Sequence, residues 1–448
     1  MEIAIRTAQL LLSLSILVVL HELGHFLTAR YFGTRVEKFY LFFNPWFSLF
    51  KKKIGDTEYG IGWLPLGGYV KISGMIDESM DTEQMALPPQ PYEFRSKPAW
   101  QRLIIMLGGV IVNFILGFLI YASLLFFNGE TVLPSNNVTD GYMITNEFAK
   151  GIGFQNGDKI LSFDNKEVGY FGELIDQMIF SKSAQVERAG EKVNIEIPED
   201  MLGQLSEKSR QNPFFYPRFP FLVSAIPDSS INAKAGFAVK DTVVAINGQS
   251  IRYFDEAGTI LKSLKGASAI VSVKRDGGIF DLPVQVSDSG YIEIGYHRVK
   301  LSEMAKANLY EFDVKEYGFL ASIPAGWNKM TFEVKKYLRG FALIFQPKTG
   351  AYKGLGGFAA IAGLFPTVWD WTIFWERTAF ISLILAVMNL LPIPALDGGH
   401  VMFLLYEMVT GREPNQKFME YAQMVGIIIL LALLLFANGN DLFRFLRG

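Results

Sequence analysis

Two histidines and a glutamate near the amino terminus form the pattern with the clearest chemical meaning in the chain. The stretch His21-Glu22-Leu23-Gly24-His25 is an H-E-x-x-H motif. On a helix the two histidines, four residues apart, project from one face and can bind the same metal ion, while Glu22 lies beside them and is free to carry a proton. This arrangement is typical of a zinc peptidase.

The motif lies in an unusual place, because it ends an apolar run from Leu10 to Leu20 that only Ser13 and Ser15 interrupt. Three ionisable side chains in a segment that should cross a bilayer are costly unless they serve a function. The alternative is a chance pentapeptide, or a helix end whose histidines are satisfied by hydrogen bonds. The apolar context, together with a third ligand later in the chain, argues against that alternative.

The composition is that of a membrane protein with soluble parts. Half of the 448 residues are hydrophobic and only 19% are charged, and the mean hydropathy is +0.23. The chain is long enough for several domains. It contains no cysteine, so disulfides and thiolate ligands are excluded and any metal must be bound by His, Asp or Glu. A formal net charge of −2 gives no reason to expect nucleic acid as a partner.

Four segments are long and apolar enough to be transmembrane helices. They are Thr7 to Leu27, Leu103 to Phe127, Thr378 to Leu396 and Ala422 to Ala437. A cleaved signal peptide is the alternative for the first segment, but no small-residue cleavage pattern follows it, so we expect it to be retained. The predicted fold is a polytopic α-helical membrane protein with four spans.

Basic residues near the span ends predict the orientation of these helices. The connection between the first two spans contains Arg30, Arg35, Lys38, Lys51, Lys52, Lys53, Arg95, Lys97 and Arg102, and that between the last two contains Arg412 and Lys417. Both connections are therefore expected in the cytoplasm. The termini and the long central segment then lie on the opposite side, although Arg444 and Arg447 weaken this signal at the carboxyl end.

The first connection also contains a stretch of aromatic, β-branched and glycine residues from Tyr59 to Ile72, which favours a β-hairpin over a helix. We predict a hairpin over residues 59–73, at the membrane surface or dipping into it beside the first helix, where it would present a strand edge. An ordinary surface hairpin is the alternative.

Residues 129–300 are expected outside the membrane and contain an internal repeat. Three landmarks recur at a constant offset of 83 residues: Gly153-Phe154 and Gly236-Phe237, Asp158 and Asp241, Tyr170-Phe171 and Tyr253-Phe254. A constant offset without insertions indicates two copies of one small domain.

Each copy resembles a PDZ domain, most clearly the second. There Ala235-Gly236-Phe237 leads to Asp241-Thr242-Val243-Val244-Ala245-Ile246-Asn247-Gly248, which is similar to the glycine turn, strand and Asn-Gly hairpin turn of that family. The resemblance implies a groove to which a peptide can add as a strand. A spacer or a size filter is the alternative.

The segment after the repeats mixes apolar and basic residues from Lys315 to Gln346, as in an amphipathic helix on a membrane surface. We expect Pro324 and Gly326 to break it into two pieces. A second stretch, Leu355 to Leu364, is too short to span and is predicted to be re-entrant or interfacial.

The predicted organisation has five parts. They are residues 1–128 (first membrane part), 129–215 and 216–300 (two PDZ-like domains), 301–370 (amphipathic or interfacial helices) and 371–448 (second membrane part).

A metal bound by two histidines needs at least one more protein ligand and a position open to water. Asp397 is the best candidate, because it follows two prolines that break the third span and precedes two glycines. The predicted orientation places Asp397 and the histidine pair at similar depth, near the cytoplasmic side. An exposed helix-end aspartate is the alternative.

Taken together, these features resemble the site-2 protease family of intramembrane zinc metalloproteases. The matching features are H-E-x-x-H in the first span, the stretch Asn389-Leu390-Leu391-Pro392-Ile393-Pro394-Ala395-Leu396-Asp397-Gly398 in a later one, and PDZ-like domains between them. The resemblance extends over nearly the whole chain and is nearest to the branch with two tandem PDZ domains and four spans. One departure is the Gly108-Gly109-Val110-Ile111-Val112-Asn113-Phe114 stretch, where the family commonly has Gly-Pro ahead of Asn-Phe.

The resemblance implies a site and a reaction. His21, His25 and Asp397 would bind one Zn²⁺ per chain, and Glu22 would be the catalytic acid and base. Asn389 would hold the substrate backbone. The remaining implied substrate contacts, in the hairpin region, are Gly67, Gly68, Tyr69 and Val70.

The resemblance also implies a cellular role. Substrates would be single-span membrane proteins, such as an anti-sigma factor already cut on the periplasmic side by an upstream site-1 type protease, and signal-peptide remnants. The protein would reside in the bacterial inner membrane with its PDZ domains and both termini periplasmic, and the PDZ pair would exclude untrimmed proteins.

Two other classes of function compete with proteolysis. A non-catalytic membrane scaffold needs no Glu beside the first histidine, and a metal transporter should have ligands on several spans. Neither explains Glu22 together with Asp397. His400 is expected to be a helix-start residue or to support a ligand, and His297, in the second repeat, is expected to be unrelated to the site.

Overall fold

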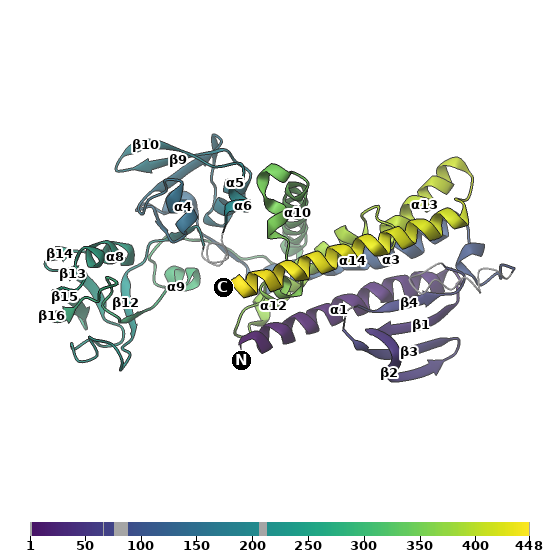
Figure 1. Ribbon diagram of the computed structural model, residues 1–448, viewed down its shortest axis with the longest axis horizontal. Coiled ribbons are helices and arrows are strands. Elements are labelled where there is room, and N and C mark those ends of the chain that lie inside the picture. The colour runs from purple at the N-terminus through teal and green to yellow at the C-terminus, as the bar shows by residue number, and fades with distance from the viewer. Residues whose placement is uncertain (1, 66, 76–87, 206–212, 448) are drawn as a thin grey trace. The chain divides into compact units, whose positions relative to one another are not determined.

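A computed structural model describes residues 2–65, 67–75, 88–205 and 213–447 (Figure 1). The chain divides into two compact units. The first unit comprises residues 1–129, 316–347 and 351–448, and the second comprises residues 130–315 and 348–350. The site predicted from the sequence lies in the first unit.

Four helices in the described part of the first unit are long and apolar enough to cross a membrane. They are α1 (Glu2–Tyr31), α3 (Ala99–Asn128), α12 (Trp371–Asn389) and α14 (Gln416–Arg447). All four predicted segments are therefore helical. The third prediction is wrong at its carboxyl end, because α12 stops at Asn389 and not at Leu396.

The chain is irregular between Asn389 and Asp397, where the next helix, α13 (Asp397–Thr410), begins. Pro392 and Pro394 have no backbone N–H to continue α12. Gly399 lets α13 lie close to this irregular segment, since a Cβ there would be 2.7 Å from the Ile393 carbonyl oxygen. Asp397 is thus the first residue of a new helix and not the last of a span.

Helix α10 (Phe319–Ile344) is a single helix, so the expected break at Pro324 and Gly326 is wrong. Pro324 lies near the helix start, where it removes only one backbone hydrogen bond. Gly326 serves close packing: a Cβ there would lie 2.7 Å from the Cα of Ala122 on α3. The nearby segment from Leu355 is short, as expected, and contains α11 (Phe358–Ala362).

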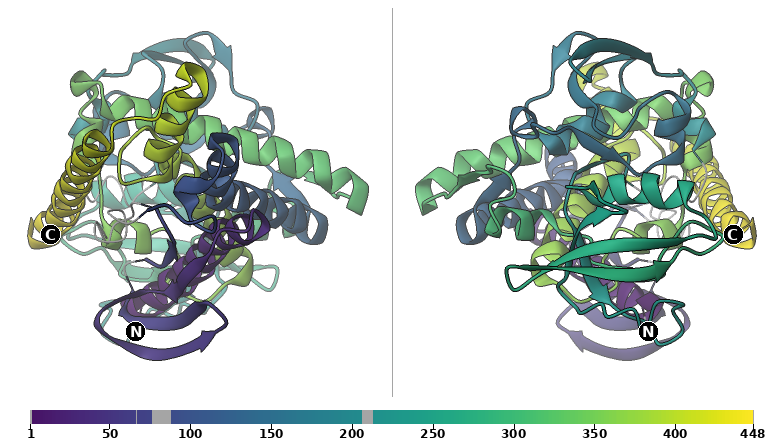
Figure 2. Two further views of the ribbon diagram at one scale, coloured as in Figure 1. Left: turned by 90° about the vertical axis from the view of Figure 1, so that its right-hand side faces the viewer. Right: turned by 90° about the vertical axis from the view of Figure 1, so that its left-hand side faces the viewer.

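A four-stranded sheet lies beside α1 in the first unit (Figures 1 and 2). Its strands are β1 (Val36–Leu41), β2 (Phe43–Ile54), β3 (Thr57–Leu64) and β4 (Tyr69–Ile72), in the order β2-β3-β1-β4. The predicted hairpin over residues 59–73 is wrong. Strands β3 and β4 both pair with β1, in parallel and antiparallel fashion respectively.

The hairpin of this sheet is instead β2–β3, closed by a two-residue turn at Gly55 and Asp56. Gly55 has a φ of 61°, the left-handed conformation that such turns favour. Strand β1 has β3 on one side and β4 on the other, which places β4 at an edge of the sheet.

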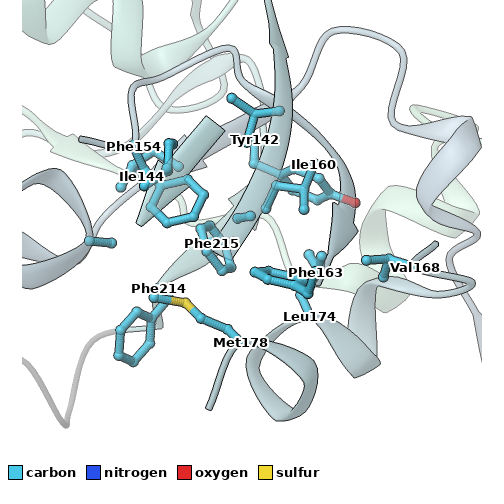
Figure 3. Close-up of a cluster of buried hydrophobic side chains, with 14 of the residues drawn as sticks. Tyr142, Ile144, Phe154, Ile160, Phe163, Val168, Leu174, Met178, Phe214 and Phe215 are labelled. Carbon is cyan, nitrogen blue, oxygen red and sulfur yellow. The ribbon is translucent and has the colours of Figure 1, made fainter. Parts of the chain in front are cut away.

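The second unit contains two separate groups of strands. The first group has the order β10-β9-β7-β8 and comprises β7 (Lys159–Phe163), β8 (Lys166–Glu167), β9 (Ser183–Arg188) and β10 (Glu191–Glu196), with α4 (Glu147–Gly151), α5 (Leu174–Ile179) and α6 (Met201–Gln204). Figure 3 shows its core, in which Phe163 and Phe215 converge with Met178 from α5.

The second group has the order β16-β15-β13-β12-β17, with β14 paired to β13. Its elements are β12 (Phe221–Ala225), β13 (Thr242–Ile246), β14 (Gln249–Ser250), β15 (Ser268–Arg275), β16 (Gly278–Gln285), β17 (Gly295–Tyr296) and α8 (Phe254–Ser263). The long β15–β16 pair is visible in Figure 2. This group has a core of its own, around Val243, Val271 and Leu261.

Shorter elements complete the second unit. They are the antiparallel pairs β6 (Tyr142–Ile144) with β11 (Phe215–Pro217) and β5 (Glu130–Val132) with β18 (Asp313–Lys315), and the helix α9 (Leu301–Lys306). The β5–β18 pair brings together the two ends of this part of the chain.

The same polar contacts recur in both groups, and their aspartate and glycine partners lie at the offset of 83 residues. Asp158 accepts two hydrogen bonds from Arg188, and Asp241 accepts two from Arg275. In each group the arginine also donates to the carbonyl of the glycine five residues before the aspartate. Hydrogen bonds from Arg275 hold the pKa of Asp241 below its ordinary value.

We expect Asp241→Asn to loosen the second group alone, because it removes a charge-assisted hydrogen bond from Arg275. Amide hydrogen exchange in β13 and β15 of the full-length protein should accelerate on the order of tenfold. Since the pKa of Asp241 is lowered on folding, its contribution is complete at neutral pH and is lost as the pH falls below the ordinary aspartate range.

The matched variant Asp158→Asn should loosen β7 and β9 and leave β13 and β15 unchanged. Equal acceleration in both groups by either variant would contradict two independent cores.

Candidate active site

The H-E-x-x-H motif is held against α3 by a close approach of two helix backbones. A Cβ on Gly108 would lie 2.6 Å from the carbonyl oxygen of Gly24, which lies inside the motif. Glycine on both helices allows this contact, as is common where helices associate in membranes. His21 and His25 are consequently pressed against α3 and buried.

His21, His25 and Asp397 lie together in the structure. The Nε2 atoms of the two histidines are 3.3 Å apart, and Asp397 Oδ2 lies 3.3 Å from Nε2 of His21 and 3.4 Å from that of His25. Among the described residues, no other group of His, Asp and Glu forms such a cluster. The irregular segment after α12 thus carries Asp397 to the histidine pair.

These three ligand atoms fit a zinc ion. Tetrahedral coordination with bonds of about 2.0–2.1 Å places ligand atoms about 3.3–3.4 Å from one another, which is the spacing found here. Asp397 Oδ2 is also buried without a hydrogen-bond partner, as suits an atom that binds a cation. A neutral histidine pair with one carboxylate is a donor set that zinc accepts.

One face of α3 contacts both histidine rings. His25 Nδ1 lies 2.8 Å from the backbone carbonyl oxygen of Ile105, and His21 Nδ1 lies 3.2 Å from the amide of Asn113. Gly109 lies between these partners, and a Cβ there would be 2.5 Å from His25 Nε2 and 2.6 Å from His21 Cε1. Only a glycine therefore leaves room for the pair at this level.

A cavity of about 730 Å³ opens beside the cluster. Besides the three clustered residues, its walls include every other site residue predicted from the sequence: Glu22, Gly67, Gly68, Tyr69, Val70 and Asn389. Asn389 Nδ2 lies 3.3 Å from His21 Nε2, and the backbone amide of Val70 interacts with Glu22. The edge strand β4 and the end of α12 therefore face the same space as the cluster.

The remaining histidines lie in different surroundings. His400, in the first turn of α13, lines the cavity without joining the cluster. His297, in the second unit, pairs with Glu303 at 2.7 Å. Ile105, Gly109, Asn113 and Gln423 also contact the histidines or line the cavity, and the sequence reasoning missed them. Of these positions, only Asn113 and Gln423 could have been noticed from the sequence, because a polar side chain is unusual in an apolar span.

The family model for peptidase family M50 matches residues 9–433. This chain belongs to peptidase family M50. It is 27% identical over 456 residues to the "Regulator of sigma-E protease RseP" of Escherichia coli, covering 98% of each chain. It is 28% identical over 465 residues to the "Protease RseP" of Yersinia pestis, covering 99% of this chain and all of the relative.

A third relative is the "Putative zinc metalloprotease" of Treponema pallidum, 25% identical over 457 residues and 96% of both chains. The M50 chain described here is accordingly an RseP-like zinc metalloprotease. Its four long apolar helices and its sheet-rich second unit agree with a membrane protease.

Gly109→Ala should abolish zinc binding by this M50 peptidase while leaving α3 helical, because alanine favours a helix but its Cβ would overlap both histidine rings. The zinc content of the purified protein should fall from one per chain to near zero. Ile111→Ala is the control, since Ile111 is exposed on the same helix and its truncation should leave the zinc content unchanged. A Gly109→Ala protein with a full zinc content would contradict the described packing.

Proposed function

We propose that the protein hydrolyses a peptide bond within the transmembrane segment of single-span membrane proteins. The observation that carries this proposal is the zinc-like spacing of His21, His25 and Asp397 beside a cavity that also contains Glu22. We assign the three clustered residues as the zinc ligands and Glu22 as the catalytic acid and base.

Zinc, when bound, supplies a water of lowered pKa and polarises the scissile carbonyl. Glu22 accepts the proton of the attacking water and then donates it to the leaving amide nitrogen, so that the peptide bond is exchanged for a carboxylate and an amine. His25 donates from Nδ1 to the Ile105 carbonyl at 2.8 Å, which keeps its Nε2 free for the metal.

A transmembrane substrate must unwind before attack, because its peptide groups are hidden in helical hydrogen bonds. Strand β4 is at an edge of its sheet and lines the cavity through Tyr69 and Val70. We propose that the unwound substrate pairs with this edge and that Asn389 binds its backbone next to the zinc. Edge pairing would replace the hydrogen bonds lost by the substrate.

The basic residues and the relatives support a proposal for the cellular setting. We propose a bacterial inner-membrane protein with four spans, both termini and the second unit in the periplasm, and the cavity near the cytoplasmic side. The name "Regulator of sigma-E protease RseP" carried by a relative supports an anti-sigma factor as substrate, after an upstream site-1 type protease has trimmed it. Signal-peptide remnants are a second proposed substrate class.

We further propose that residues 129–215 and 216–300, which make up most of the second unit, are a pair of PDZ-like domains that exclude untrimmed proteins. The repeated Asp–Arg contacts and the two separate cores support this assignment.

Replacing Glu22 by Gln should leave one zinc per chain but lower the rate of cleavage by roughly 10²–10⁴-fold or more, because proton transfer is lost. His25→Ala should lose both zinc and cleavage. The assay is digestion of a single-span model protein by the detergent-purified enzyme, with fragments identified by mass spectrometry. His297→Ala, which alters a histidine of the second unit, should match the wild type. Undiminished cleavage by Glu22→Gln would refute the assigned mechanism.

Removal of the second unit should abolish discrimination by substrate size. Glu130 pairs with Lys315, so the two ends of the segment are adjacent and a short Gly-Ser linker can replace the residues between them. The shortened enzyme should cleave trimmed and untrimmed substrates at similar rates, whereas the full-length enzyme should prefer the trimmed one. The shortened chain carrying Glu22→Gln controls for other proteases. A preference that persists after deletion would argue against gating.

A further inference from the structure

Asn113 is a wholly buried amide in the middle of an apolar span. Its side chain is 0% exposed, and α3 carries no charged residue from Leu103 to Phe127. A buried amide costs free energy unless its polar atoms are used. Its only side-chain hydrogen bond among the described residues joins Nδ2 to His21 Nδ1 at 3.2 Å, and its Oδ1 is buried without a partner.

The chemistry of the histidine decides how this contact must be arranged when zinc is bound. His21 presents Nε2 to Asp397 and to His25, so Nε2 is the nitrogen that would bind the metal. A neutral histidine that binds a metal through Nε2 carries its proton on Nδ1, and that proton needs an acceptor. The side-chain amide of Asn113 must therefore flip, exchanging Oδ1 and Nδ2, so that Oδ1 lies against Nδ1 of His21. The two ends of the amide have nearly the same shape, so this exchange needs no repacking.

The partner of the second histidine supports the same arrangement. His25 Nδ1 faces a backbone carbonyl, that of Ile105, eight residues before Asn113 on the same helix face. The two histidines are four residues apart on α1, and α3 supplies one hydrogen-bond partner to each ring, from either side of Gly109. Because a carbonyl cannot donate, the tautomer of His25 is set by the backbone, whereas that of His21 depends on one side chain.

We propose that Asn113 is a positioning residue for zinc: through Oδ1 it accepts the Nδ1 proton of His21 and so fixes the ring with Nε2 towards the metal. This inference rests on the proposed function, since it requires that His21 bind zinc. Asn113 itself is not one of the three clustered metal ligands and acts through His21.

Three variants of the full-length, detergent-purified protein test the proposal by zinc affinity, measured by competition with a chelator. Asn113→Leu has similar volume but no acceptor and should bind zinc about 10–100-fold more weakly. Asn113→Asp keeps an oxygen acceptor and should bind within about threefold of the wild type. Ser382→Ala is the matched control: Ser382 donates to the backbone carbonyl of Asn113 at 2.8 Å, so this variant removes a different buried hydrogen bond at the same residue and leaves the contact between Asn113 and His21 in place.

A second readout uses Co²⁺ in place of zinc. The visible absorption of bound Co²⁺ should change in Asn113→Leu, because the His21 ring loses its fixed orientation, and should be retained in Asn113→Asp and Ser382→Ala. If Asn113→Leu lowers the unfolding temperature of the metal-free protein, Asn113→Ala takes its place in the comparison.

The possible outcomes separate this inference from the proposed function. Wild-type zinc affinity in Asn113→Leu, equal weakening by Asn113→Asp, or equal weakening by Ser382→Ala would each overturn the positioning role. A wild-type protein that binds no zinc would instead overturn the assignment of His21, His25 and Asp397 as ligands.

Discussion

The arrangement of the first unit depends on three ionisable side chains, those of His21, His25 and Asp397, which lie among apolar helices and pair with one another. A lone carboxylate in such surroundings is strongly disfavoured, and so is an unpaired imidazole proton. Bringing Asp397 within 3.4 Å of both histidines lowers that cost and prepares a site for a cation. The close approach of Gly24 and Gly108 and the early end of α12 are both conditions for this contact. Glycines and prolines, which usually destabilise helices, therefore allow the three residues of the site to come together.

The cavity beside the cluster is lined by helices and by a β-strand. Its walls come from helices, whose backbone groups are satisfied internally, and from the strand β4, which lies at an edge of its sheet. An unwound substrate has backbone groups that its own helix no longer satisfies. A strand edge beside a metal site thus matches what the proposed reaction requires, and a bundle of helices alone would not offer it.

Local patterns predicted the elements better than their pairing. The four apolar segments are helices because their length and composition leave no alternative, and the repeat is evident from its constant offset. The hairpin prediction failed because the stretch from Tyr59 to Ile72 contains two strands whose shared partner, β1, lies outside it. The predicted break in α10 failed because Pro324 is near the helix start and Gly326 packs on Ala122, a contact invisible from the helix sequence.

The sequence by itself determined which residues can do the chemistry. Histidines four apart with an adjacent glutamate, and a carboxylate after a proline-broken span, are recognisable because metal ligation and proton transfer demand particular side chains at particular spacings. Only the tertiary structure decided how those side chains are oriented, since the hydrogen-bond partners of His21 and His25 come from α3, some eighty to ninety positions away. The sequence does not show which backbone carbonyl will accept a hydrogen bond from a side chain. The amide of Asn113 reaches the His21 ring only because the two helices pack closely.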